Sequence, residues 1–186
     1  MSIPIFSIFC IDFRYDNLTA DFFQGVGLLN SYFAVTAAGG ALPLGYKCSC
    51  SEICKKGKCK PNNKDMTLLR KNVVKNLEIA LTLQPIEKLY LLNHQDCGAI
   101  KAYLGCSGYP YTLGSNNAKE IEINQDILKY AKKYMAKKFK GKTITLSLID
   151  INGSVAEYNT STKKWTLVFT GARTNPLGLW FNYTFI

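Results

Sequence analysis

Residues 89–99 of this 186-residue chain have the sequence LYLLNHQDCGA, in which a short apolar run is followed at once by polar side chains. Leu89 to Leu92 is continuous and apolar, as expected for a strand that is buried on both faces of a sheet. His94, the single histidine of the chain, and Cys97 come after it. Open α/β sheets place their chemistry beyond the carboxyl ends of the strands, so this stretch predicts a central strand that ends in functional side chains.

A second apolar run ends in the same way, because Ile3 to Phe9 leads into CIDFR at residues 10–14. If the two runs are parallel strands, they bring Cys10, His94 and Cys97 together at one edge of the sheet. Two thiolates and one imidazole form a zinc site with an open fourth position, which is typical of catalytic rather than structural zinc. Taken singly, Cys10 also fits a buried core cysteine, and His94 also fits a hydrogen-bonded loop histidine.

Length and composition predict one soluble globular domain. Hydrophobic residues make up 47% of the chain. No apolar run approaches the ~18 residues that span a bilayer, so no membrane association is expected. Ile3 to Phe9 lacks the basic flank and the cleavage site of a signal peptide, which predicts a cytoplasmic protein. In the reducing cytosol, its seven cysteines favour metal binding or catalysis over disulfides.

The chain is basic, with a formal net charge of +10. Much of the excess lysine lies in two segments, Lys47 to Lys75 and Lys129 to Lys142. A basic balance can indicate nucleic-acid binding. Neither an RNA motif with interleaved aromatic residues nor a recognised DNA-binding pattern accompanies these lysines, so solvated lysine faces are favoured and nucleic acid is not expected as a partner.

Hydrophobic periodicity predicts strands and helices that alternate along the chain. Met66 to Leu83 has helical spacing of its apolar residues and is followed by Pro85, which cannot continue a helix. Asn152-Gly153 is typical of a hairpin turn. The expected strands are Ile3–Phe9, Tyr32–Thr36, Lys88–Leu92, Thr143–Ile151, Val155–Tyr158 and Trp165–Phe169, and the expected helices are Asp16–Gln24, Met66–Leu83, Ala99–Leu104 and Ile121–Phe139.

This order predicts the α/β class, with a mainly parallel central sheet of about four strands, an antiparallel edge hairpin, and helices on both faces. The domain is expected to span residues 1–170 and to carry a Cys-rich basic insertion at 46–64. Residues 171–186 are expected to form a C-terminal tail, which is apolar and aromatic but has no clear period.

Together these motifs resemble the β-class carbonic anhydrases, over roughly residues 3 to 169. That family has Cys-x-Asp-x-Arg after its first core strand and His-x-x-Cys-Gly after its third, and here CIDFR stands at 10–14 and HQDCG at 94–98. Its Gly-x-Gly segment and Ala-Gly loop are matched by residues 25–27 and 38–39. The chain departs from the family at Gly40, where the family usually has Asn.

The resemblance implies a carbonic anhydrase, which hydrates CO2 reversibly to bicarbonate and a proton by attack of zinc hydroxide. It implies Zn²⁺ held by Cys10, His94 and Cys97, with Asp12 as a fourth ligand in a resting state. It also implies a homodimer or a higher homo-oligomer. Zinc with two thiolates is formally neutral and a weak Lewis acid, so activity is expected to favour alkaline pH.

The flanking residues have chemistry that suits this reaction. Asp12 can accept a hydrogen bond from the attacking hydroxide, and Arg14 would hold Asp12 ionised in a two-pronged pair, although an ordinary ion pair explains the two as well. Gly98 can offer a backbone N–H to a developing oxyanion, and Gly39 lets the main chain approach a substrate closely. Since His94 is used as a ligand, no histidine shuttle exists, and turnover is expected to depend on buffer.

A separate cysteine cluster lies in the basic insertion, at Cys48, Cys50, Cys54 and Cys59. Four thiols this close in sequence can hold a second metal ion or an iron–sulfur cluster. Their spacing does not match the paired C-x-x-C of zinc ribbons, however, and a loop with incidental or disulfide-linked cysteines is the alternative.

Two further functions fit the same residues. The first is hydrolysis of a CO2 analogue, carbonyl sulfide or carbon disulfide, at the same metal site. The second is a catalytically inactive zinc-stabilised scaffold, whose basic Cys-rich loop binds a partner.

Overall fold

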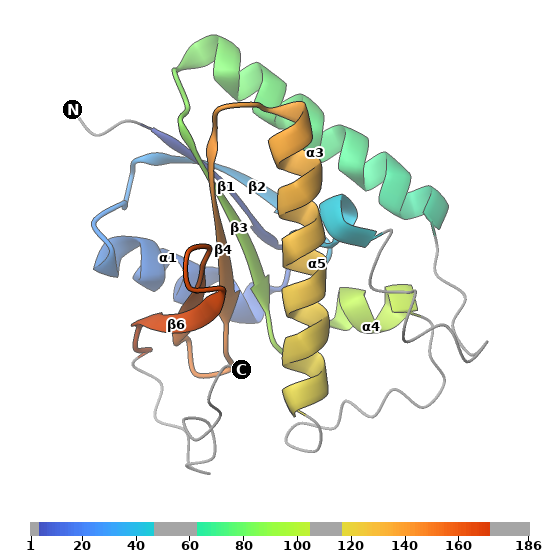
Figure 1. Ribbon diagram of the computed structural model, residues 1–186, viewed down its shortest axis with the longest axis vertical. Coiled ribbons are helices and arrows are strands. Elements are labelled where there is room, and N and C mark those ends of the chain that lie inside the picture. The colour runs from blue at the N-terminus through green and yellow to red at the C-terminus, as the bar shows by residue number, and fades with distance from the viewer. Residues whose placement is uncertain (1–3, 47–62, 105–116, 172–186) are drawn as a thin grey trace.

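The computed structural model describes residues 4–46, 63–104 and 117–171 of the chain. A six-stranded sheet forms the centre of this part (Figure 1). Its spatial order is β2-β1-β3-β4-β5-β6. The first four of these are parallel to one another, and β5 and β6 are antiparallel. The strands are β1 (Ile5–Cys10), β2 (Tyr32–Ala37), β3 (Lys88–His94), β4 (Thr143–Ile149), β5 (Val155–Asn159) and β6 (Lys164–Phe169).

The predicted fold class is confirmed, including the parallel core and the antiparallel edge hairpin that follows β4. The sheet has six strands in all, where about four and a hairpin were expected. β3 also runs two residues further than predicted, so that His94 is the last residue of the strand rather than a residue beyond it.

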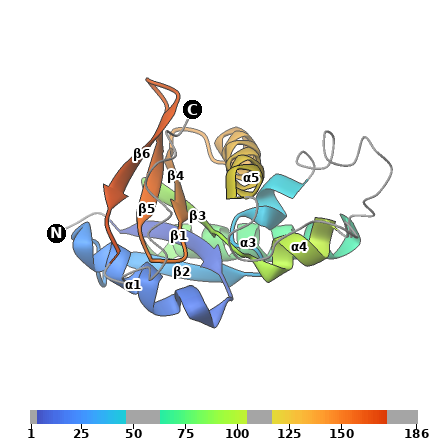
Figure 2. The ribbon, with the colours of Figure 1, turned by 90° about the horizontal axis from the view of Figure 1, so that it is seen from below.

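Helices cover both faces of the sheet, as Figure 2 shows from the end of the strands. α3 (Asn63–Leu83) and α5 (Asn117–Lys138) lie on one face, and α1 (Asp16–Gly25) lies on the other. Successive strand residues point to opposite faces. In β1, Phe6 and Ile8 therefore join the core beneath α3 and α5, whereas Ile5 and Phe9 join the core beneath α1.

A third apolar cluster lies at the carboxyl ends of the strands, where the predicted site residues are. Cys10 and Cys97 pack there with Leu42, Ile100 and Ile127. Ile100 belongs to the short helix α4 (Gly98–Leu104), and Ile127 belongs to α5. The two cysteines therefore lie in a dry environment that α4 and α5 help to enclose.

Several local elements differ from the sequence-based expectation. α3 begins at Asn63 and α5 at Asn117, each before the predicted start. A 3-10 helix, η1 (Phe13–Tyr15), follows β1, and residues 42–46 are helical where only the preceding loop was expected. Pro43 lies in the first turn of that short helix, a position that tolerates proline. The Cys-rich insertion, the tail and the loop expected at 105–117 lie, apart from their end residues, outside the described residues.

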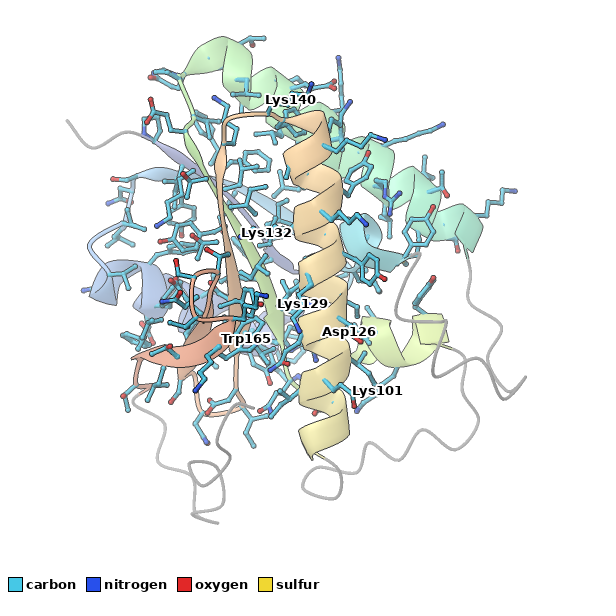
Figure 3. The ribbon with its side chains drawn as sticks, viewed as in Figure 1. Lys101, Asp126, Lys129, Lys132, Lys140 and Trp165 are labelled. Atoms are coloured by element: carbon cyan, nitrogen blue, oxygen red, sulfur yellow. The ribbon has the colours of Figure 1, made fainter. Side chains whose placement is uncertain are left out.

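The lysines of α5 lie mainly on its outer side, as predicted. Figure 3 shows Lys129 and Lys132 spaced along the helix and Lys140 just beyond its end. Lys138 forms an ion pair with Glu78 of α3 at 3.2 Å, and Lys129 lies over the ring of Tyr158. No helix within the described ranges combines the length and apolarity that crossing a membrane requires.

The packing of α3 gives a direct test of the core. Both Leu77 and Leu68 belong to α3. The Leu77 side chain is fully buried in the core between α3 and the sheet, whereas Leu68 is 60% exposed. We expect Leu77→Ala to lower the free energy of unfolding by about 2 to 5 kcal/mol, because a cavity remains where the side chain was. The matched variant Leu68→Ala should change it by less than about 0.5 kcal/mol. Urea unfolding measures both values, and equal losses in the two variants would contradict this packing.

Candidate metal centre

Three potential metal ligands converge at the carboxyl ends of β1 and β3. Cys10 and His94 are the last residues of these two neighbouring parallel strands, and Cys97 directly precedes α4. The Sγ atoms of Cys10 and Cys97 lie 3.9 Å apart. One ligand atom from each of the three residues lies within 4.8 Å of the others. The structure thus brings together the three residues that the sequence motifs single out.

The donor atoms fit a metal ion. Two thiolates bound at about 2.3 Å to a tetrahedral ion lie about 3.8 Å apart, close to the observed separation of the two sulfur atoms. A disulfide would need about 2.05 Å. His94 Nε2 is buried and has no hydrogen-bond partner, although buried polar atoms are normally partnered. A cation between the two sulfur atoms and this nitrogen would satisfy all three.

The orientation of the imidazole is fixed on its other side. His94 Nδ1 lies 2.7 Å from the carbonyl oxygen of Gln95. A proton on Nδ1 is donated to that oxygen, which leaves Nε2 with a free lone pair. Tyr15 stacks on the ring with 3.9 Å between centroids and donates its hydroxyl to the same carbonyl at 2.8 Å. Burial raises the pKa of Tyr15 and keeps the phenol protonated as a donor.

The environment of Cys10 favours the thiolate. A hydrogen bond from the Cys97 thiol, with a smaller contribution from His94, lowers the pKa of Cys10 against the opposing effect of burial. The same contact, together with burial, raises the pKa of Cys97. The backbone N–H of Gly39 also donates to Cys10 Sγ at 3.3 Å. These contacts therefore favour a thiolate at Cys10, the form in which a cysteine binds a metal.

Asp12 and Arg14 form the two-pronged pair that the sequence suggested. Arg14 Nε donates to Asp12 Oδ1 at 2.9 Å, and Nη2 donates to Oδ2 at 2.6 Å. These hydrogen bonds hold the pKa of Asp12 below its ordinary value. Asp12 Oδ2 lies 4.0 Å from His94 Nε2, so an ionised carboxylate stands beside one of the three ligand atoms.

Asp96 completes this network and was not predicted from the sequence. Arg14 Nη1 donates to Asp96 Oδ2 at 2.8 Å, and Arg14 Nη2 donates to the Asp96 carbonyl at 3.0 Å. The Lys101 ammonium also donates to the Asp96 carboxylate. The backbone of Asp96 is left-handed, with φ of 54°, a conformation that Asp and Asn tolerate better than most residues.

Helix α5 holds the same turn from the other side. The backbone N–H of Asp96 donates to the carboxylate of Glu120, near the start of α5. Figure 3 shows Lys101 beside these N-terminal turns of α5. Burial raises the pKa of Glu120. Asp96 and Lys101 lie close together in the sequence, but Arg14 and Glu120, the other partners of Asp96, are far from it in the chain and reach it only in the folded protein.

The remaining predicted residues have less specific surroundings. Gly39 directs its N–H to Cys10, and Gly98 stands at the start of α4, where a Cβ would meet nothing within 4 Å. Substrate contact by either glycine stays a prediction. The insertion cysteines, which are Cys48, Cys50, Cys54 and Cys59, lie outside the described residues, so a second metal site also stays a prediction.

The Asp96 ion pairs predict a dependence of stability on pH. Although burial opposes them, hydrogen bonds from Lys101 and Arg14 hold the pKa of Asp96 below its ordinary value of 3.8. Its stabilising contribution is therefore complete above that value and is lost as the pH falls through the lower pKa of the folded state. We expect Asp96→Asn to be less stable at neutral pH and less sensitive to acid.

Urea unfolding of the chelator-treated protein from about pH 7 to about pH 3 measures this difference. The free energy of unfolding should fall more steeply for the wild type than for Asp96→Asn. Asp21→Asn, at an exposed position on α1, is the control and should follow the wild type. Parallel curves for the wild type and Asp96→Asn would show that these ion pairs contribute nothing.

Comparisons with known proteins agree with this fold. No family model matches the chain. An uncharacterized protein of Rickettsia bellii (strain RML369-C) is 25% identical over 150 residues, which cover 81% of this chain and 78% of that protein. The solved structure of the β-carbonic anhydrase CcaA matches with a TM-score of 0.50 at 15% identity, over 89% of this chain and 84% of that one. The carbonic anhydrase of Streptococcus mutans matches with a TM-score of 0.43 at 15% identity, over 86% and 87%. The match with CcaA shows that the chain has a β-carbonic anhydrase-like fold, and the structure places in it a cluster of two cysteines and one histidine that can hold a metal ion.

Proposed function

We propose that this protein is a zinc-dependent carbonic anhydrase that converts CO2 and water reversibly to bicarbonate and a proton. The observation that carries the proposal is the convergence of Cys10 Sγ, Cys97 Sγ and the unpartnered His94 Nε2 at the carboxyl end of a β-carbonic anhydrase-like sheet. Two thiolates and one imidazole suit zinc and leave its fourth position for solvent. Cys10, His94 and Cys97 would hold the ion.

Zinc bound there would supply the Lewis acidity that lowers the pKa of a bound water, and because two thiolates weaken this effect, the water would become a nucleophile at alkaline rather than neutral pH. Asp12 accepts a hydrogen bond from the attacking water and so directs a lone pair of its oxygen toward the carbon of CO2. Arg14 keeps Asp12 ionised and holds its plane in place through two hydrogen bonds. Because both carboxylate oxygens are engaged by Arg14, the pair supports Asp12 as a hydrogen-bond acceptor rather than as a fourth ligand.

Backbone groups complete the proposed site. The N–H of Gly98 donates to the oxygen that gains charge as bicarbonate forms. The N–H of Gly39 is already bonded to Cys10 Sγ. Because Gly39 has no side chain, a substrate can approach the main chain closely at its Cα. The single histidine of the chain is used as a ligand, so the proton leaves through water and buffer rather than through a second imidazole.

The setting that we propose is a cytoplasmic homodimer or higher homo-oligomer. Cys10 and Cys97 form no disulfide, which is compatible with a reducing compartment. Ile11 and Phe13 flank Asp12 and are 63% and 86% exposed. Exposed apolar side chains of this size, close together in one segment beside Asp12, support a surface that a second subunit covers.

Stopped-flow CO2 hydration tests the reaction. The zinc-loaded wild type should accelerate hydration, and Cys10→Ser, which removes a ligand, should abolish the acceleration. Asp12→Asn should lower kcat by about 100-fold or more, because a neutral amide is a weaker acceptor of the hydrogen bond from the attacking water and cannot form the same pair with Arg14. Asp21→Asn is the matched control, with an expected rate equal to that of the wild type. A zinc-loaded wild type that is no faster than Cys10→Ser would favour the inactive scaffold.

Metal counting separates the core site from the Cys-rich insertion. We expect one zinc ion per chain in the wild type and none in the double variant Cys10→Ser/Cys97→Ser, because the ligand set of the core site is then incomplete. The double variant Cys48→Ser/Cys50→Ser should retain the core ion. Elemental analysis after removal of loosely bound metal gives these values. Two ions in the wild type and one in each double variant would assign the second ion to the insertion.

A further inference from the structure

The hydrogen bond from Gly39 to Cys10 depends on a turn that has little rigidity of its own. Residues 38–41 follow β2, and both Gly39 and Gly40 have positive φ, of 81° and 61°. Within the turn, the N–H of Gly40 bonds the carbonyl of Ala37, and the N–H of Leu42 bonds that of Gly39. Two adjacent glycines lose much conformational entropy on folding, so such a turn needs an anchor outside itself.

Asn93 is that anchor. The backbone N–H of Ala41 donates to Asn93 Oδ1 at 2.8 Å. Gly40 lies so close to β3 that a Cβ there would clash with the carbonyl of Leu92 and lie 3.0 Å from Asn93 Oδ1. The turn is therefore pressed against the end of β3, and position 40 has no room for a side chain. The Asn93 side chain occupies that space from β3, which β1 separates from β2 in the sheet.

The orientation of the Asn93 amide is dictated by its partners. An N–H group only donates, so the oxygen of Asn93 must face Ala41 and its nitrogen must face away. Asn93 Nδ2 donates to Asn124 Oδ1 of α5 at 3.0 Å. Asn124 Nδ2 donates in turn to the carbonyl of Glu120 at 3.1 Å. Asn93 and Asn124 are each only 1% exposed, so water does not replace these contacts.

Asn93 and His94 point to opposite faces of the sheet, as neighbouring strand residues must. His94 faces Tyr15, beside α1, and provides a ligand atom. Asn93 faces α5 and, through the turn, directs the Gly39 amide to Cys10 Sγ. Two adjacent residues of one strand thus reach the metal centre by separate routes.

We propose that Asn93 is a positioning residue that holds the Gly39 N–H on the Cys10 sulfur and so makes the metal centre more electrophilic. This inference rests on the proposed role of Cys10 as a zinc ligand. An N–H donor withdraws electron density from a thiolate, which then donates less charge to its ion. With two thiolates, a zinc ion is formally neutral, so a donor of this kind offsets part of the resulting loss of Lewis acidity.

Replacing the metal with cobalt tests the proposal, because the energy of the sulfur-to-cobalt charge-transfer band does not change when a variant is merely less stable. We compare the wild type with Asn93→Leu, which has a similar shape but no acceptor, and with Asn93→Asp. A protonated Asp at this position presents an oxygen to Ala41 and an O–H donor to Asn124. The readouts are the energy of the sulfur-to-cobalt charge-transfer band and the cobalt affinity measured by competition with a chelator.

Asn93→Leu should shift the charge-transfer band to lower energy, because the sulfur then donates more charge to cobalt. It should also weaken cobalt binding by about tenfold, because the turn no longer holds Cys10 in position, and this is the lower end of what loss of such a supporting contact costs. Asn93→Asp should restore the wild-type band. Leu77→Ala, a core variant with no polar atom to offer the turn, should leave the band unchanged. A wild-type band in cobalt-loaded Asn93→Leu overturns the inference, as does an equal shift in Leu77→Ala.

A second measurement needs no variant. In wild-type protein loaded with an NMR-active cadmium isotope, the N–H···S hydrogen bond should give a scalar coupling between cadmium and the amide proton of Gly39. Absence of that coupling, with cadmium bound by the cysteines, overturns the inference and leaves the proposed function intact. Absence of any thiolate band or cysteine-bound cadmium in the wild type overturns the proposed function, and the inference with it.

Discussion

The register between β1 and β3 is the constraint on which the cluster of Cys10, His94 and Cys97 depends. The two strands pair in parallel, with Ile5 opposite Lys88 and Ile8 opposite Leu91, so Cys10 and His94 end at the same edge of the sheet. Side chains alternate between faces along a strand, and a slip of one residue would exchange His94 for Asn93 at the ligand position. Burial enforces the register, because apolar residues of β1 and β3 fill the cores on both faces. The register between β1 and β3 therefore determines both the packing of the core and the positions of the donor atoms.

A second constraint on the site is the set of ion pairs that neutralises the carboxylates of Asp12 and Asp96. Arg14 bonds Asp12 and Asp96 at once, and Lys101 bonds Asp96. One guanidinium thus joins the segment after β1 to the segment after β3, the two segments that carry the ligands. Because Arg14 has five donors in a fixed planar arrangement, a lysine at this position could not make the same set of contacts. The carboxylate nearest the ligand atoms is held by the same group that ties the two segments together.

The sequence was informative where local pattern determines structure. Apolar runs that end in Cys10 and His94 predicted two strands and their common edge, and helical spacing predicted α3. The contributions of Tyr15, Asp96, Glu120 and Asn93 were missed because each depends on contacts between distant segments. Arg14 and Asp96 are 82 residues apart, and Asp96 and Glu120 are 24 apart. No periodicity in a single sequence reports such pairs, since their encounter is a product of the complete fold. The extension of β3 through His94 was missed for a related reason, because polar residues end an apolar pattern without ending the strand.

The position of α5 in the chain bears on how the protein matures during synthesis. All three candidate ligands have left the ribosome once about 100 residues are exposed. Glu120 and Asn124, which hold the turns around those ligands, belong to a helix made later, and β4, the neighbour of β3, is made later still. A nascent chain therefore displays its soft donor atoms before the scaffold that orients them exists. An arrangement of these donor atoms that can hold an ion is therefore complete only after the C-terminal half of the chain has been made.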